Sequence, residues 1–228
     1  MVTVDLVDTL QISAAVTSSL RLTGDLTGDV PGGADNLVVR ALEAAGVTAA
    51  VVLEKRIPTA AGLGGGSADA AAVLRWASVS DPALALFIGA DVPFCLVGGR
   101  ARVAGIGEIV EPLPHLDQSF TLLTPPFAVA TTAVYRAWDD MGGPVGAHGN
   151  DLEPAALRVE PRLAAYRDLL WQITGTRPRL AGSGGTWFAA GDLADQSGDA
   201  GAGTLSVQGH QPGPRVVHTV ARSSPTRS

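Results

Sequence analysis

The stretch Pro58-Thr-Ala-Ala-Gly62-Leu-Gly64-Gly65-Gly66-Ser67-Ala68-Asp69-Ala70-Ala71 decides the fold class. It follows Thr48–Leu53, a run that predicts a strand, and leads into Ala70–Trp76, whose alanine-rich composition predicts a helix. Glycines between a strand and a helix let the backbone approach a ligand closely, and the helix N-terminus adds a partial positive charge. The stretch therefore predicts a phosphate-binding turn, with an ordinary glycine turn as the alternative.

This turn matches neither of two common glycine-rich nucleotide motifs. No Lys-Ser/Thr pair follows the glycines, as a Walker A loop requires. The G-x-G-x-x-G spacing of dinucleotide-binding folds, with its downstream ribose-binding acid, is also missing. Any phosphate chemistry must therefore belong to another class of nucleotide-binding protein.

Composition narrows the possible partners. The 228 residues contain 16 basic and 22 acidic side chains, for a formal net charge of −6, so a broad basic surface for nucleic acid is not expected. A single cysteine, Cys95, excludes an internal disulfide framework and a multi-cysteine metal site. Long apolar segments are missing and the first residues are acidic, so we expect a cytoplasmic protein with no membrane partner.

The first half of the chain alternates predicted strands and helices. Val2–Leu6 and Leu10–Leu22 favour extended structure. Asp35-Asn36 offers an N-cap to a helix over Leu37–Ala45, which Gly46 ends. A short helix is expected after Ser80-Asp81-Pro82, and strand-like residues flank Gly98-Gly99.

The pattern changes near residues 115–120, which predicts a second lobe. Its expected elements are a strand at Phe120–Thr124, a helix at Thr131–Met141, a helical run from Asn150 to Ile173, strands flanking Gly182–Thr186, a loop at 191–213 and a last strand at Arg215–Ala221. The fold class is therefore α+β with two lobes, at residues 1–118 and 119–228.

The glycine-rich stretch resembles the second motif of the kinase superfamily named for galactokinase, homoserine kinase, mevalonate kinase and phosphomevalonate kinase. Its Gly-Gly-Gly-Ser-Ala-Asp-Ala form is similar to the branch that phosphorylates 4-diphosphocytidyl-2-C-methyl-D-erythritol. Further segments agree in order: Asp35-Asn36-Leu37, Gly89-Ala90-Asp91-Val92-Pro93-Phe94, Asn150-Asp151-Leu152-Glu153-Pro154 and Gly182-Ser183-Gly184-Gly185-Thr186. The resemblance runs from about residue 5 to residue 190 and implies a two-lobed small-molecule kinase that uses ATP and Mg²⁺.

The resemblance also implies the site residues. The ATP phosphates would be wrapped by Pro58, Thr59, Ala60, Ala61, Gly62, Leu63, Gly64, Gly65, Gly66, Ser67 and Ala68. Asp91 would be the general base for the substrate hydroxyl, whereas its local sequence alone favours a turn aspartate that accepts backbone N–H groups. Gly182, Ser183 and Gly184 would line the active-site cleft through backbone N–H groups from the second lobe.

Neighbouring residues receive smaller roles. Ser67 is a candidate to reach a phosphate-bound Mg²⁺, whereas Asp69 is interpreted as a helix acid and not a metal ligand. Phe127 lies where the family contacts the cytidine end of the substrate, but packing is its favoured role. Gly185 stands where the family usually has proline, which predicts a looser loop.

Two family elements are not found in this sequence. The family begins with a strand that carries Lys-x-Asn, followed by Gly-Tyr-His, and neither pattern occurs here. The sole lysine, Lys55, precedes the glycine turn, where family members also have lysine, so it is not the missing group. We expect either a start upstream of Met1, with the first strand missing here, or a catalytically impaired nucleotide-binding homologue. A homoserine- or mevalonate-type kinase is the third alternative. Transfer by these residues alone should be very weak or absent.

Overall fold

The computed structural model describes residues 1–26, 30–191 and 215–220, and most of the loop predicted at 191–213 lies outside them. The chain forms two compact units. The first contains Met1–Thr59, Gly64–Asp117 and Thr219–Ser228, and the second contains Ala60–Leu63 and Gln118–His218. The division is therefore less simple than a single cut after residue 118, because part of the glycine turn groups with the second unit.

The first unit is built on a three-stranded sheet of order β1-β3-β2. Its strands are β1 (Thr9–Ala14), β2 (Ser19–Thr23) and β3 (Ala49–Glu54). The central strand β3 runs antiparallel to β1 and parallel to β2. Every second residue of β3, from Ala49 to Val51 and Leu53, is buried, as expected when one face of a strand meets a core.

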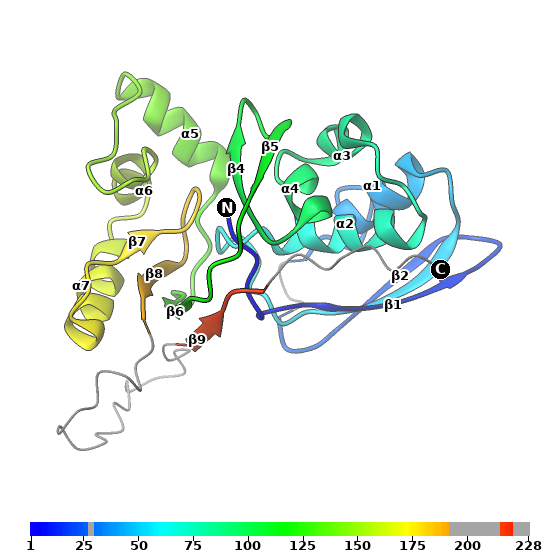
Figure 1. The fold of residues 1–228 in the computed structure, drawn as a ribbon, viewed down its shortest axis with the longest axis horizontal. Coiled ribbons are helices and arrows are strands. Elements are labelled where there is room, and N and C mark those ends of the chain that lie inside the picture. The colour runs from blue at the N-terminus through cyan, green and yellow to red at the C-terminus, as the bar shows by residue number, and fades with distance from the viewer. Residues whose placement is uncertain (27–29, 192–214, 221–228) are drawn as a thin grey trace, which may run out of the picture. The chain divides into compact units, whose positions relative to one another are not determined.

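Four helices and a hairpin complete the first unit. They are α1 (Leu37–Ala44), α2 (Gly65–Trp76), α3 (Pro82–Ile88), α4 (Val92–Val97), β4 (Arg100–Ala104) and β5 (Ile109–Leu113). The predicted N-cap of α1 is confirmed, because the Asn36 side chain accepts a hydrogen bond from the Val38 amide at 2.9 Å. Figure 1 shows α1 and α2 over one face of the sheet, where Leu42 and Leu74 join Val51 in the core.

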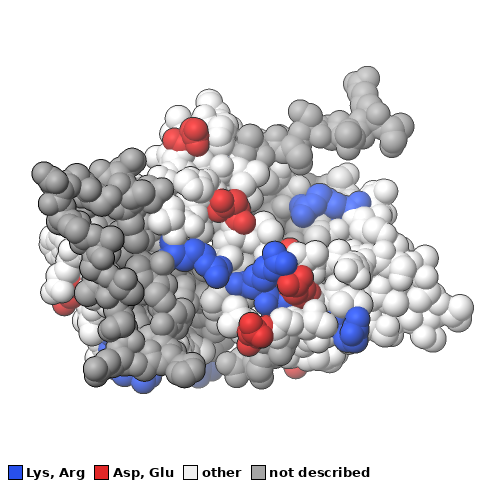
Figure 2. All heavy atoms as spheres, turned by 90° about the horizontal axis from the view of Figure 1, so that it is seen from below, with Lys and Arg blue, Asp and Glu red and all other residues white. Residues whose placement is uncertain are grey.

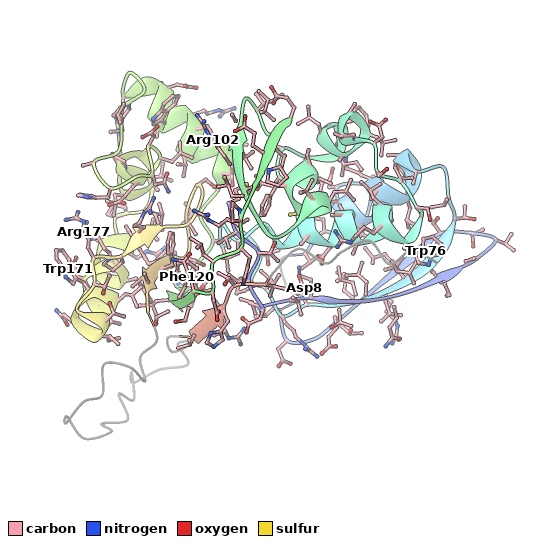
Figure 3. The ribbon with its side chains drawn as sticks, viewed as in Figure 1. Asp8, Trp76, Arg102, Phe120, Trp171 and Arg177 are labelled. Atoms are coloured by element: carbon pink, nitrogen blue, oxygen red, sulfur yellow. The ribbon has the colours of Figure 1, made fainter. Side chains whose placement is uncertain are left out.

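The second unit combines a four-stranded sheet with three helices. Its elements are β6 (Ser119–Leu123), α5 (Thr131–Asp140), α6 (Glu153–Val159), α7 (Leu163–Thr174), β7 (Arg179–Leu180), β8 (Trp187–Ala190) and β9 (Arg215–His218). The strand order is β7-β8-β6-β9, and all neighbouring strands are antiparallel. Fully buried Trp187, Leu163 and Leu170 fill the core. At the surface, the Arg177 guanidinium lies 5.3 Å from the centre of the Trp171 ring, and both residues are labelled in Figure 3.

Two predicted strands near the N-terminus are shorter than expected. Val2–Leu6 contributes only isolated bridges, from Val2 to Arg100 and from Val4 to Thr219. The segment Leu10–Leu22 is interrupted between Ala14 and Ser19, so it forms parts of two strands that both pair with β3. The alternation of apolar residues indicated extended structure but not where the chain turns.

Three helix boundaries also differ from the prediction. The residues before Gly98 form helix α4, because Pro93 is tolerated in its first turn and Gly98, with φ +70°, ends it. Helix α2 begins at Gly65 and not at Ala70, so the glycines form its first turn. The helical run to Ile173 is divided at Pro161, whose missing N–H cannot continue a helix.

The described residues contain no helix that is both long enough and apolar enough to span a membrane. Figure 2 shows one face of the molecule, on which basic and acidic side chains both occur, some of them next to each other.

Candidate active site

The start of helix α2 presents its backbone to a ligand. Gly64 is the N-cap, in the left-handed conformation with φ +68° and ψ +20°, and its position carries no side-chain cap. The amides of the first helical turn, from Gly65 to Ser67, have no partner within an α-helix. Together with the helix dipole, such amides suit an anion.

Tight packing underneath explains why glycine is needed at Gly65. A Cβ atom there would lie 2.9 Å from Ile57 Cγ2, which is closer than real Cβ atoms approach, and 3.5 Å from Asp8 Oδ2. The first turn of α2 therefore rests directly on the residues that connect β3 to the glycine turn. The sequence indicated that these glycines serve a ligand, but not that they also permit this close contact.

A buried ion cluster lies beside this contact. The Lys55 ammonium donates hydrogen bonds to Asp8 Oδ2 and, at 3.0 Å, to Asp69 Oδ2. Each of the three side chains is at most 4% exposed. Asp8, which immediately precedes β1 and is labelled in Figure 3, also accepts the amides of Arg56 and Ile57 through Oδ1. The sequence pattern indicates no role for Asp8, and it predicts only a helix acid at Asp69.

Burial controls the ionisation of Asp69. Desolvation raises the pKa of its carboxyl to about 6, against the lowering effect of Lys55, and the nearby Asp8 carboxylate raises it further. The cluster contains two carboxyl groups and one ammonium, so full ionisation leaves one negative charge in excess. The Lys55 ammonium is paired with both carboxylates of this cluster.

Asp91 lies next to the same turn. A Cβ atom placed on Gly64 would be 4.0 Å from Asp91 Oδ2, so this carboxylate adjoins the start of α2. Asp91 is the N-cap residue of α4, yet its side chain makes no capping hydrogen bond, unlike Asp81, which caps α3 through the Ala83 amide. The alternative of a turn aspartate bound to backbone N–H groups is therefore wrong for the described residues. Asp91 is exposed, while desolvation by the surrounding protein raises its pKa.

The other part of the glycine turn, Ala60–Leu63, packs within the second unit. The Thr186 amide donates to the Ala61 carbonyl at 3.0 Å. Gly62 has φ +72°, and a Cβ atom there would overlap the Ala181 carbonyl oxygen and lie 2.8 Å from that of Gly184. Two glycine-rich segments far apart in sequence therefore meet backbone to backbone. We call Ala60–Leu63 together with Ala181–Thr186 the glycine junction.

Side chains of α5 and of the turn before α6 hold the predicted cleft loop. Asn150 donates through Nδ2 to the carbonyls of Leu180, at 2.9 Å, and Gly182, at 2.8 Å. The Ser183 hydroxyl pairs with that of Thr131 at 2.8 Å. Asn150 belongs to one of the quoted motifs, but its role as an anchor was not predicted, since its partners lie 30 and 32 residues away.

Gly185 and Phe127 have structural environments of their own. Gly185 has φ +105°, which proline cannot adopt, and a Cβ atom there would lie 2.8 Å from the Ala60 carbonyl oxygen. This loop conformation is therefore incompatible with proline at position 185. Phe127 packs edge-on against Tyr166, and the Arg162 guanidinium lies 4.1 Å from its ring centre, so its ring is used in packing.

Comparisons with known proteins agree on one family. Residues 36–99 match the model of the GHMP kinase N-terminal domain. The 4-diphosphocytidyl-2-C-methyl-D-erythritol kinase of Paramagnetospirillum magneticum is 41% identical over 219 residues, which cover 79% of this chain and 75% of the relative. The chain belongs to the 4-diphosphocytidyl-2-C-methyl-D-erythritol kinase family. The enzyme of the same name from Cereibacter sphaeroides is 36% identical, with 90% of this chain and 83% of the relative covered.

Solved structures place this family member in the expected fold. A crystal structure of 4-(cytidine 5'-diphospho)-2C-methyl-D-erythritol kinase superposes with a TM-score of 0.65 at 35% identity, covering 83% of this chain and 78% of that one. Homoserine kinase from Cytophaga hutchinsonii has a TM-score of 0.64 at 19% identity, covering 97% and 88%. The second likeness shows the fold alone. The α+β small-molecule kinase predicted from the sequence is thereby confirmed.

Proposed function

We propose that this chain transfers the γ-phosphoryl group of ATP to the 2-hydroxyl of 4-diphosphocytidyl-2-C-methyl-D-erythritol. Membership of the kinase family supports the choice of substrate. The observation that carries the chemistry is the Asp91 carboxylate, which adjoins the N-terminus of α2 at Gly64 and has no capping hydrogen bond of its own. An anion site and a base thus lie side by side.

Each part has a defined task in the transfer. Backbone amides at Gly65, Gly66 and Ser67 face the negative charge of the phosphates, and the family motif assigns the phosphates to the rest of Pro58–Ala68 as well. Asp91 orients the substrate hydroxyl and accepts its proton, as the new oxygen–phosphorus bond forms and the bond from the γ-phosphorus to the bridging oxygen breaks. ADP leaves with that bridging oxygen.

A divalent cation fits this arrangement as a companion of the nucleotide. Mg²⁺ binds largely through substrate phosphates and keeps several waters, so it does not require the Asp91 carboxylate, which serves the substrate hydroxyl. The Ser67 hydroxyl, in the first turn of α2, is the candidate protein ligand. Bound there, the cation would neutralise phosphate charge. We also propose that the protein acts in the cytoplasm.

One observation favours a second candidate, a nucleotide-binding homologue with impaired transfer. Lys55 is buried between Asp8 and Asp69, so Lys55 does not supply a cation beside Asp91. Loss of a transition-state charge usually lowers the rate by orders of magnitude and leaves ground-state binding less affected. This candidate binds ATP and does not turn over.

The experiment separates binding from transfer. ATP binding is measured by calorimetry, and phosphorylation of 4-diphosphocytidyl-2-C-methyl-D-erythritol by release of ADP. Asp91→Asn should lower kcat by about 10²–10⁴ with ATP affinity retained, because a general base contributes that much. Asp81→Asn, the same change at the N-cap of α3, is the matched control, since asparagine also caps well.

The pH profile gives an independent check. The base must be deprotonated, so kcat should fall as pH drops through the raised pKa of Asp91. Unchanged turnover in Asp91→Asn would remove Asp91 from the base role. Binding of ATP without any turnover by the unmodified chain would select the second candidate.

A further inference from the structure

The Asp8–Lys55–Asp69 cluster closes the base of the glycine turn. Asp8 accepts the amides of Arg56 and Ile57, the last residues before Pro58. Lys55 connects the same carboxylate to Asp69, which lies on α2 just beyond the turn. The residues that enter the turn and those that leave it are therefore joined through one buried ammonium.

The geometry of α2 depends on this connection. Asp69 follows Gly65 by four residues, so the two share a face of the helix. On that face Gly65 touches Ile57 and lies near Asp8 Oδ2, and Asp69 is bonded to Lys55 one turn later. Sterics at one turn and an ion pair at the next together fix the rotation of α2 about its axis, and with it the direction of its first amides.

Stability alone is a poor explanation for such a cluster. Removing charges from water costs several kcal/mol for each ion, and buried ion pairs are often replaceable by apolar residues without loss of stability. A buried ion pair does, however, fix the relative positions of the groups it joins, because its donors and acceptors bond in only one arrangement. Here that arrangement holds the strand exit and the helix entry on either side of a phosphate-binding turn.

We propose that Lys55, together with Asp8 and Asp69, is a positioning residue that orients the N-terminal amides of α2 toward the phosphates of ATP. The proposal rests on the proposed function only for the identity of the ligand. Lys55 and both aspartates are buried, so they act through the backbone and touch no phosphate themselves.

The test is a series of affinities for ATP and AMP, measured by calorimetry on the full chain. Lys55→Met and Asp69→Ala should each weaken ATP binding by about tenfold or more, because a loosened turn must be ordered when the ligand binds. The loss should be smaller for AMP, which presents fewer phosphates to the turn. Asp69→Asn keeps an acceptor for Lys55 and should restore most of the affinity.

Arg56→Met is the matched control. It removes a positive charge from the adjacent residue, whose side chain is 54% exposed and pairs only with Glu54 among the described residues. It should change ATP affinity by no more than about twofold, since surface ion pairs contribute little. Equal effects of Arg56→Met and Lys55→Met would mean that only net charge matters.

Folding is checked separately by circular dichroism and thermal unfolding. If Lys55→Met does not fold, Asp69→Ala, which leaves the Lys55–Asp8 pair intact, decides the outcome. Folded Asp69→Ala with unchanged ATP affinity would overturn the proposal. Absence of ATP binding by the unmodified chain would instead overturn the proposed function, so the two failures are distinguishable.

Discussion

The two compact units hold their parts of the glycine turn by opposite means. In the first unit, charged side chains do so, because Lys55 joins Asp8 to Asp69 under the first turns of α2. In the second unit, the glycine junction is a contact of backbones, where side chains are excluded and the Thr186 amide reaches the Ala61 carbonyl. Charge changes should therefore disturb the first contact, and an added methyl group should disturb the second.

The largest effect should come from removing the central charge. Lys55→Met leaves two buried carboxylates facing each other, and breaking a buried pair typically costs about 3–5 kcal/mol. Urea unfolding at neutral pH measures the loss. Arg56→Met should lose less than about 1 kcal/mol. Similar losses of unfolding free energy in both variants would show that the buried cluster stabilises the protein no more than a surface ion pair. The two units would then not differ in the way proposed.

An added methyl group should be nearly as damaging in the glycine junction. Gly62→Ala combines a left-handed backbone with overlap on the Ala181 carbonyl, for an expected loss of about 2–4 kcal/mol and reduced turnover. Gly142→Ala isolates the backbone component, since Gly142 has φ +80° and no atom within 4 Å of the added Cβ. Its expected cost is about 1–2 kcal/mol. If the two variants lose the same free energy, packing at the junction is not what requires glycine.

The pH dependence of the free energy of unfolding tests the ionisation of Asp69 in the Asp8–Lys55–Asp69 cluster. Burial raises the pKa of Asp69 from its ordinary 3.8 to about 6, so the folded state holds this proton more tightly than the unfolded state. The contribution to stability is therefore present at low pH and is lost as pH rises from about 4 to about 6, by about 3 kcal/mol at most.

Asparagine does not titrate, so Asp69→Asn should lack the pH-dependent part of the free energy of unfolding that comes from Asp69. The difference in unfolding free energy between the unmodified chain and Asp69→Asn should therefore shift in favour of the variant as pH rises through this window. Denaturant unfolding at several pH values measures it. A difference that stays constant with pH would show that Asp69 is ionised throughout.

The smallest expected effect lies at Asn150, which anchors the predicted cleft loop. Asn150→Ala removes both donors to the Leu180 and Gly182 carbonyls and should cost about 1–2 kcal/mol, with a higher KM. Thr131→Val, which removes only the exposed hydroxyl pair with Ser183, should cost about half as much or less. Thermal unfolding and steady-state kinetics of both variants measure these effects, and a larger loss for Thr131→Val would assign the anchor to the hydroxyl pair.

Local rules predicted the elements whose causes are local. The Asn36 cap of α1 was predicted because a side chain bonds to an amide two residues away, and Asp81 caps the short helix expected after Ser80-Asp81-Pro82 in the same way. Helix α4 was missed, since a short apolar run is compatible with either a strand or a helix. The burial of Val92 and Phe94, together with the helix limits at Pro93 and Gly98, decided between them.

By itself, the sequence determined the family and the α+β class, because these follow from ordered motifs and local backbone preferences, and it predicted a phosphate-binding role for the glycine turn. The tertiary structure alone decided what holds that turn. Lys55 and Asp8 are 47 residues apart and meet only because β1 pairs with β3, and Gly62 meets the Gly182 loop only within the second unit. Such contacts depend on which surfaces pack together, and neither residue spacing nor composition specifies that.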